Sequence, residues 1–254
     1  MGSVMRKIGF SAEIHKTRKA MGEAAGKKAE ELIVQCLKKK KEVRIIAASA
    51  PSQNEIVAYL AKSKLIDWHR VTAFHMDEYI GINENAPQAF GKWLKDRLFG
   101  KVPLKEVHYL NPGAADPAKE CERYTALLKK APIDVLLGGI GETGHLAFND
   151  PPVADFNDPL TVKVINIEVT SRNQQVHEGC FPALKDVPKK AYTLTIPILQ
   201  SAASLVYTVP KATKAAAIGK MFKGPIDKKC PASILRCHQE CYLFLDADSG
   251  KELL

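Results

Sequence analysis

Short apolar runs alternate along the chain with longer stretches in which apolar residues recur at helical spacing. A run that is apolar at successive positions, such as 135–140, is typical of a strand covered on both faces. The longer periodic stretches predict amphipathic helices. We expect strands at 43–48, 71–76, 107–110, 135–140, 162–169, 192–196, 205–209 and 242–245, and helices at 12–37, 53–62, 87–98, 117–130 and 212–222.

Strands that alternate with helices of this length predict right-handed crossovers and a mostly parallel sheet. No internal repeat, linker-like stretch or compositional break divides the 254 residues. We therefore expect an α/β fold, a three-layer α/β/α arrangement with a Rossmann-like sheet, in one domain over residues 1–254. In such a sheet ligands bind just beyond the carboxyl ends of the strands.

Composition indicates a globular protein, with 46% hydrophobic and 26% charged residues. The uncharged apolar runs are far shorter than the roughly 20 residues that span a bilayer. Residues 1–7 lead into a polar stretch and lack the apolar core of a secretory signal. We expect a soluble, cytoplasmic protein with no membrane partner.

The net charge of +9, from 37 basic and 28 acidic residues, suits a protein that binds an anion. The lysine pairs and the run 38–41 lie at predicted helix faces, helix ends or loops, without interleaved aromatic residues. This pattern favours a solvated surface over a nucleic-acid site.

Six cysteines occur without a Cys-x-x-Cys motif. Cys230, Cys237, His238 and Cys241 are the candidate zinc ligands, but their spacing fits no common ligand pattern. We favour buried, reduced thiols and expect no metal.

The first loop with candidate chemistry follows the predicted strand 71–76. Asp77 and Glu78 are adjacent carboxylates at a strand end, where burial is costly unless they are hydrogen-bonded or used. A carboxylate in a partly dry cleft has a raised pKa and can accept a carbon-bound proton. A structural cap by Asp77 is the alternative.

The second loop, 138–150, contains four glycines and His145, which lies between Glu142 and Asp150. A carboxylate beside a histidine can select its tautomer, so catalysis is favoured over a structural turn. The spacing Gly139-x-Gly141-x-x-Gly144 matches a dinucleotide fingerprint. However, no acidic residue ends the following strand, and we discount nicotinamide binding.

The third loop, 49–55, follows the strand 43–48 and begins a predicted helix, whose free N–H groups suit an anion. Pro51 removes one donor. Ser52 and Glu55 have the spacing of a capping box. Lys211 and Lys214, which follow the strand 205–209, are expected at the same edge.

These three loops, in this order, resemble the glucosamine-6-phosphate deaminase (isomerase) family, which is related to the 6-phosphogluconolactonases. The resemblance covers nearly the whole chain. Met-Asp-Glu-Tyr and Gly-His-x-Ala-Phe-Asn favour the deaminase branch, because the lactonase branch usually has Arg after Asp-Glu-Glu and Thr-Ala-Ser after Gly-His. The matching segments are 74–81, 87–90, 138–149 and 231–235, with His238 before the last strand.

The resemblance implies conversion of glucosamine 6-phosphate into fructose 6-phosphate and ammonia by acid–base chemistry, with no metal or redox cofactor. It assigns ring opening to His145 and proton transfer from C2 to C1 to Asp77, with Asp150 and Glu142 as carboxylates that orient the histidine. The substrate-binding positions that it implies are Ser49, Ser52, Glu78, Gly139, Gly141, Gly144, Arg172 and Lys214.

The chain departs from the family pattern around both groups. Thr143 stands where the family has an aspartate, and Asp150 where it has a glutamate. Residues 49–52 read Ser-Ala-Pro-Ser in place of Thr-Gly-Gly-Thr. Lys214 matches the family's phosphate-binding lysine, but its arginine partner aligns with Glu178, and Arg172 is the candidate substitute.

Three alternatives therefore stay open. The first is an isomerase that acts on another hexosamine phosphate, a differently phosphorylated sugar or a sugar without the 6-phosphate. The second is a non-catalytic sugar-phosphate sensor. The third is a 6-phosphogluconolactonase-like hydrolase. In each case the partner is a small sugar rather than nucleic acid or membrane, and the sequence is compatible with a homo-oligomer.

Overall fold

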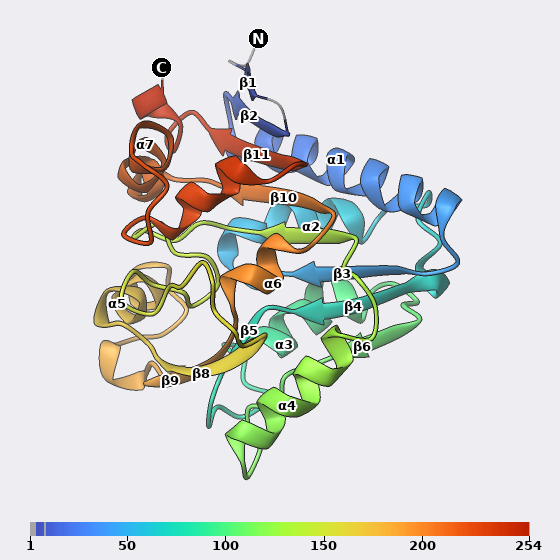
Figure 1. Cartoon of the computed structure of the whole chain (residues 1–254), viewed down its shortest axis with the longest axis vertical. Coiled ribbons are helices and arrows are strands. Elements are labelled where there is room, and N and C mark those ends of the chain that lie inside the picture. The colour runs from blue at the N-terminus through green and yellow to red at the C-terminus, as the bar shows by residue number, and fades with distance from the viewer. Residues whose placement is uncertain (1–3, 8, 254) are drawn as a thin grey trace.

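The computed structural model describes residues 4–7 and 9–253, and its centre is an eight-stranded sheet (Figure 1). Among the described strands of this sheet, neighbours are parallel except for the antiparallel pair β1 and β2. This confirms the predicted α/β fold with a mostly parallel sheet. In spatial order the strands are β1 (Val4–Lys7), β2 (Phe10–His15), β11 (Cys241–Asp246), β10 (Ser204–Val209), β7 (Val135–Gly138), β3 (Val43–Ala47), β4 (Val71–His75) and β6 (Glu106–His108).

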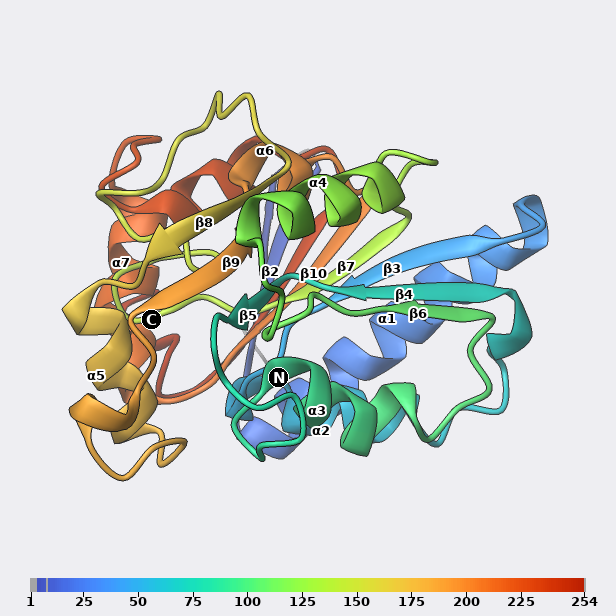
Figure 2. The same ribbon diagram turned by 90° about the horizontal axis from the view of Figure 1, so that it is seen from below.

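Helices cover both faces of this sheet, which makes the three predicted layers (Figure 2). Ile45 of β3 packs into an apolar cluster with one set of helices, and its neighbour Ile46 packs into a second cluster on the other face. Because adjacent strand residues point to opposite faces, a sheet covered on both sides needs apolar residues at successive strand positions. One face carries α1 (Arg18–Lys39), α2 (Asn54–Leu60) and α3 (Phe90–Leu94), and the other carries α4 (Pro117–Leu128), α6 (Ile196–Gln200) and α7 (Ala215–Lys223).

A three-stranded antiparallel sheet continues from the end of β4, because only Met76 separates β4 from β5 (Asp77–Tyr79). In this sheet β9 (Lys190–Leu194) lies between β5 and β8 (Val162–Asn166). Two strands expected in the parallel sheet, 162–169 and 192–196, therefore belong elsewhere. The first of these also extends too far, since β8 ends at Asn166 and Val169 already begins α5 (Val169–His177), a helix that the apolar pattern did not predict.

The predicted helix over 12–37 begins too early. Residues 10–15 form β2, in which buried and half-buried side chains alternate. The helix α1 begins at Arg18, after Thr17, whose hydroxyl accepts a hydrogen bond from the Ala20 N–H (3.1 Å). The strand was missed because its apolar positions also fit the helical spacing that follows.

Two glycines four residues apart let α1 pack closely against α2. A Cβ atom at Gly22 would lie 2.1 Å from the Cβ of Glu55, and one at Gly26 would lie 2.5 Å from the Cγ of Tyr59. Residues four apart share one helix face, so both close contacts occur along the same line.

We expect Gly26→Ala to lower the free energy of unfolding by about 1–2 kcal/mol, because overpacking outweighs the better helix propensity of alanine. Chemical denaturation measures this change. The matched control is Gly219→Ala in α7, where the added Cβ would meet the end of the flexible Glu252 side chain. Close helix packing would be contradicted if Gly26→Ala were as stable as the wild type.

Candidate active site

A pocket opens at the carboxyl ends of β3, β4, β7 and β10, where the fold predicts a ligand site. It encloses about 550 Å³ of empty space up to its open mouth. Gln174 and Gln175 of α5, which no sequence pattern singled out, line it together with Glu178. The residues predicted for the site that line this pocket are Ser49, Ser52, Asp77, Gly139, Gly141, His145 and Lys214.

Asp77 is the first residue of β5 and is 8% exposed. Within the described residues, no donor is hydrogen-bonded to its carboxylate, so the alternative of a structural cap is wrong. Burial, followed by the negative charge of Glu78, raises the pKa of Asp77 well above the usual 3.8. Such a carboxyl is a stronger base once it is ionised.

Glu78 points to the other side of β5 and caps α3 instead of lining the pocket. Its carboxylate accepts hydrogen bonds from the backbone N–H groups of Tyr79 (2.9 Å), Phe90 (3.0 Å) and Gly91 (2.8 Å). Burial raises the pKa of Glu78 to about 7, although these three donors oppose the rise. The expectation that Glu78 binds substrate is therefore wrong, because adjacent residues of a strand face opposite ways.

The glycines after β7 make room for the His145 ring. A Cβ atom at Gly141 would lie 2.0 Å from Nε2 of His145, so only glycine allows the ring to lie against this loop. Gly144 has a φ of +80°, a conformation that favours glycine. Gly144 does not line the pocket, and its expected role in substrate binding is replaced by a role in the turn.

The His145 side chain is held from its Nδ1 side by a buried polar cluster. Nδ1 lies 2.9 Å from Oδ1 of Asp150, 2.9 Å from the Thr143 hydroxyl and 3.1 Å from the Ser171 hydroxyl. Both hydroxyls also donate to Asp150, at 2.7–2.8 Å. Thr143, which stands at the sequence position of the expected aspartate, is thus part of this cluster.

This cluster determines the tautomer of His145. Burial alone would raise the pKa of Asp150, but hydrogen bonds from His145, Ser171 and Thr143 hold it below its ordinary value. An ionised carboxylate only accepts hydrogen bonds, so Nδ1 carries the hydrogen and Nε2 of the neutral ring is unprotonated.

Glu142 does not orient His145, which corrects the expectation from the sequence. Its Oε1 lies 3.7 Å from Nζ of Lys214 instead. Lys214 is 3% exposed and also lies 3.0 Å from Oε1 of Glu178. Gln174 joins these groups, since it accepts from the Glu142 N–H and donates to Glu178, each at 3.0 Å.

Arg172 is not available to a ligand in this pocket. Its guanidinium donates to the backbone carbonyls of Leu184 (2.6 Å) and Val187 (2.8 Å), and it does not line the cavity. The hypothesis that Arg172 takes the role of the family arginine is therefore wrong. Its hydrogen bonds to Leu184 and Val187 hold the guanidinium against the segment that follows α5, away from the pocket.

The loop after β3 brings two hydroxyls to the pocket. The Ser49 hydroxyl donates to the Phe90 carbonyl (3.0 Å), and that of Ser52 accepts from the Gln53 side chain (3.1 Å). The expected capping box is wrong, since α2 begins at Asn54 and Glu55 pairs with Arg18 of α1.

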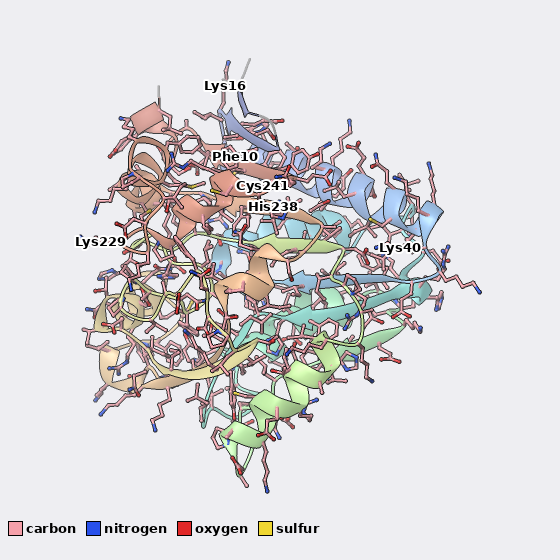
Figure 3. The ribbon with its side chains drawn as sticks, viewed as in Figure 1. Phe10, Lys16, Lys40, Lys229, His238 and Cys241 are labelled. Carbon is pink, nitrogen blue, oxygen red and sulfur yellow. The ribbon has the colours of Figure 1, made fainter. Side chains whose placement is uncertain are left out.

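The predictions about a metal site, a membrane span and surface lysines concern residues outside this pocket. Within residues 4–7 and 9–253, no three His, Cys, Asp or Glu side chains group so as to hold a metal ion. The same residues contain no helix long and apolar enough to cross a membrane. His238 of the considered zinc set, labelled beside Cys241 in Figure 3, donates from Nε2 to a backbone carbonyl (2.9 Å). Figure 3 also labels three of the exposed lysines, which lie at separate edges of the molecule: Lys16, Lys40 and Lys229.

Comparison with known proteins connects this pocket to a family. The model of the family described as glucosamine-6-phosphate isomerases/6-phosphogluconolactonase matches residues 16–244. The glucosamine-6-phosphate deaminase of Listeria monocytogenes serotype 4a (strain HCC23) is 33% identical over 230 residues, which cover 91% of this chain and 96% of that protein. The enzyme of the same name from Exiguobacterium sp. (strain ATCC BAA-1283 / AT1b) is 35% identical over 185 residues, 73% of this chain and 71% of that protein.

Solved structures show the same fold. A monomeric glucosamine-6-phosphate deaminase superposes with a TM-score of 0.85 at 24% identity, covering 95% of this chain and 99% of that one. The 6-phosphogluconolactonase of Thermotoga maritima gives a TM-score of 0.75 at 18% identity, with 92% of this chain and 98% of that one covered.

We expect Asp150→Asn to move the hydrogen of His145 from Nδ1 to Nε2, because an asparagine amide can donate to Nδ1 where the carboxylate only accepts. Nitrogen-15 NMR shifts of the imidazole distinguish the two tautomers. The control is Asp248→Asn, which removes an exposed carboxylate on another loop. An unchanged tautomer in Asp150→Asn would overturn the account of this cluster.

Proposed function

Because the chain belongs to the family of glucosamine-6-phosphate isomerases and 6-phosphogluconolactonases, we propose that it is an enzyme that converts glucosamine 6-phosphate and water into fructose 6-phosphate and ammonia. The observation that carries this proposal is one pocket lined by both a buried carboxyl, Asp77, and the imidazole of His145, whose Nδ1 faces the Asp150 carboxylate. Binding alone needs neither a carbon base nor an oriented imidazole.

His145 is the proposed catalyst of ring opening. Since Nδ1 carries its hydrogen toward Asp150, the unprotonated Nε2 is free to accept the proton of the anomeric hydroxyl. The same nitrogen then returns a proton to the ring oxygen as the C1–O5 bond breaks. The ring is neutral before and after this step, and the product is the open-chain aldehyde.

Asp77 is the proposed base for the isomerisation. Its carboxylate takes the proton from C2 of the 2-amino aldehyde while O1 gains a proton, which gives an enolamine. Return of a proton to C1, with loss of one proton from the nitrogen, leaves an imine at C2. Water then adds at C2 and ammonia leaves, which gives the ketose. Because burial raises the pKa of Asp77, the ionised group is a stronger base than an exposed aspartate.

The phosphate is the proposed partner of Ser49, Ser52 and Lys214 at the ends of β3 and β10. Gly139 supports this part of the pocket, since a Cβ atom there would lie 3.2 Å from the Ser52 hydroxyl and 3.1 Å from the Gln53 amide. A side chain at position 139 would therefore narrow the approach of a ligand to these hydroxyls.

A panel of substrates decides between this proposal and its alternatives. The release of ammonia and ketose is measured with glucosamine 6-phosphate, its galactosamine isomer and free glucosamine. The substrate that is turned over identifies the sugar. Hydrolysis of 6-phosphogluconolactone instead would favour the lactonase branch, and binding without turnover would favour a sensor. One domain over 1–254, a cytoplasmic location, a homo-oligomer and the absence of a nucleic-acid partner stay predictions.

We expect Asp77→Asn to lower kcat by at least about a hundredfold while substrate still binds, because the amide cannot accept the C2 proton. Coupled assays of ammonia and fructose 6-phosphate measure the rate. Asp248→Asn, far from the pocket in sequence and exposed, should retain wild-type turnover. Full activity of Asp77→Asn would rule out its role as the base.

The pH dependence of kcat/KM provides a second test. Asp77 acts only when ionised, so its raised pKa moves the acid limb to higher pH, and the rate should increase as the pH rises through that pKa. The limb should persist in Glu78→Gln, which removes the other carboxyl that titrates in this region. A rate already at its plateau by about pH 5, as for an ordinary aspartate, would contradict the raised pKa.

A further inference from the structure

The cationic group of the pocket is already neutralised by the protein. Among the described residues that line the cavity, Lys214 is the only lysine or arginine. Its Nζ lies 3.0 Å from Oε1 of Glu178 and 3.7 Å from Oε1 of Glu142. An anionic ligand that contacts Lys214 therefore meets two carboxylates beside it, and like charges at such distances repel strongly where water is scarce.

Of the two carboxylates beside Lys214, Glu178 competes more strongly with an anionic ligand. Its side chain is 9% exposed, whereas that of Glu142 is 23% exposed and lies farther from Lys214. Glu178 also accepts a hydrogen bond from the Gln174 amide (3.0 Å), so its carboxylate is held at the end of α5. Both Glu178 and Gln174 line the pocket, which makes their geometry part of the surface that a ligand meets.

We propose that Glu178 is a specificity-determining residue, which competes with the substrate's phosphate group for Lys214 and weakens selection for a phosphorylated over an unphosphorylated hexosamine. This inference rests on the proposed function for the identity of the sugar. The competition itself concerns only an anion and a lysine, so it can be measured without turnover.

The experiment titrates inorganic phosphate into the full-length wild-type protein and into Glu178→Gln. The amide keeps the shape of the side chain but removes its charge, so the dissociation constant of phosphate should fall by about tenfold or more. Glu122→Gln, which removes an exposed carboxylate from α4, is the matched control and should bind phosphate like the wild type. Equal phosphate affinity in Glu178→Gln and the wild type would overturn the proposal.

Two further variants test whether Glu178 lowers the phosphate affinity by its contact with Lys214. In Lys214→Met the additional Glu178→Gln change should give a smaller gain in phosphate affinity than in the wild type, because it relieves only the direct repulsion between Glu178 and phosphate. A gain as large as in the wild type would also overturn the proposal. Glu178→Asp keeps the charge but withdraws it by one methylene, and a gain smaller than that of Glu178→Gln is expected. If Glu178→Gln fails to fold, unchanged affinity in Glu178→Asp overturns the proposal instead.

Kinetics separate this inference from the proposed function. In Glu178→Gln, KM should fall for glucosamine 6-phosphate with little change for free glucosamine, a split that a general structural effect would not produce. If the wild type turns over neither sugar, the proposed function fails, while a tighter phosphate complex in Glu178→Gln would still support the competition for Lys214.

Discussion

Parallel pairing of four neighbouring strands is the constraint on which the site depends. β4, β3, β7 and β10 are adjacent and parallel, and the register pairs Ala47 with both His75 and Leu137. The chain therefore leaves all four strands at one edge of the sheet. Asp77, His145 and Lys214 line one pocket for this reason, although they are far apart in the sequence.

Buried charged side chains line the pocket or lie directly behind its wall, and each has a different environment. Asp150 is stabilised as an anion by three donors, and Lys214 by a carboxylate. Glu78 accepts three backbone N–H groups at the start of α3. Asp77 has no such partner among the described residues, so burial acts on it without compensation and raises its pKa. Among these carboxyls, the proposed role in proton transfer therefore goes to the one without a hydrogen-bond donor among the described residues.

Sequence reasoning was most successful where a local pattern has one structural meaning. Short, mostly apolar runs predicted β3, β4, β7 and β10, and seven of the predicted site residues that follow these strands line the pocket. It failed where a pattern has two meanings. Residues 10–15 fit both a strand and the helix that follows, and the predicted strand 162–169 extends from β8 to the first residue of α5. The antiparallel sheet depends on pairing between distant strands, which local periodicity does not contain.

The sequence alone determined the layered α/β fold, the loops that carry chemistry and the residue types available for it, because strand period, glycine content and chemical identity are local properties. Only the tertiary structure decided which carboxylate serves which group. Asp150 rather than Glu142 orients His145, Glu78 rather than Asp77 caps α3, and Arg172 turns away from the pocket. Those assignments depend on the direction of side chains across contacts between distant segments, and spacing along the chain does not specify such directions.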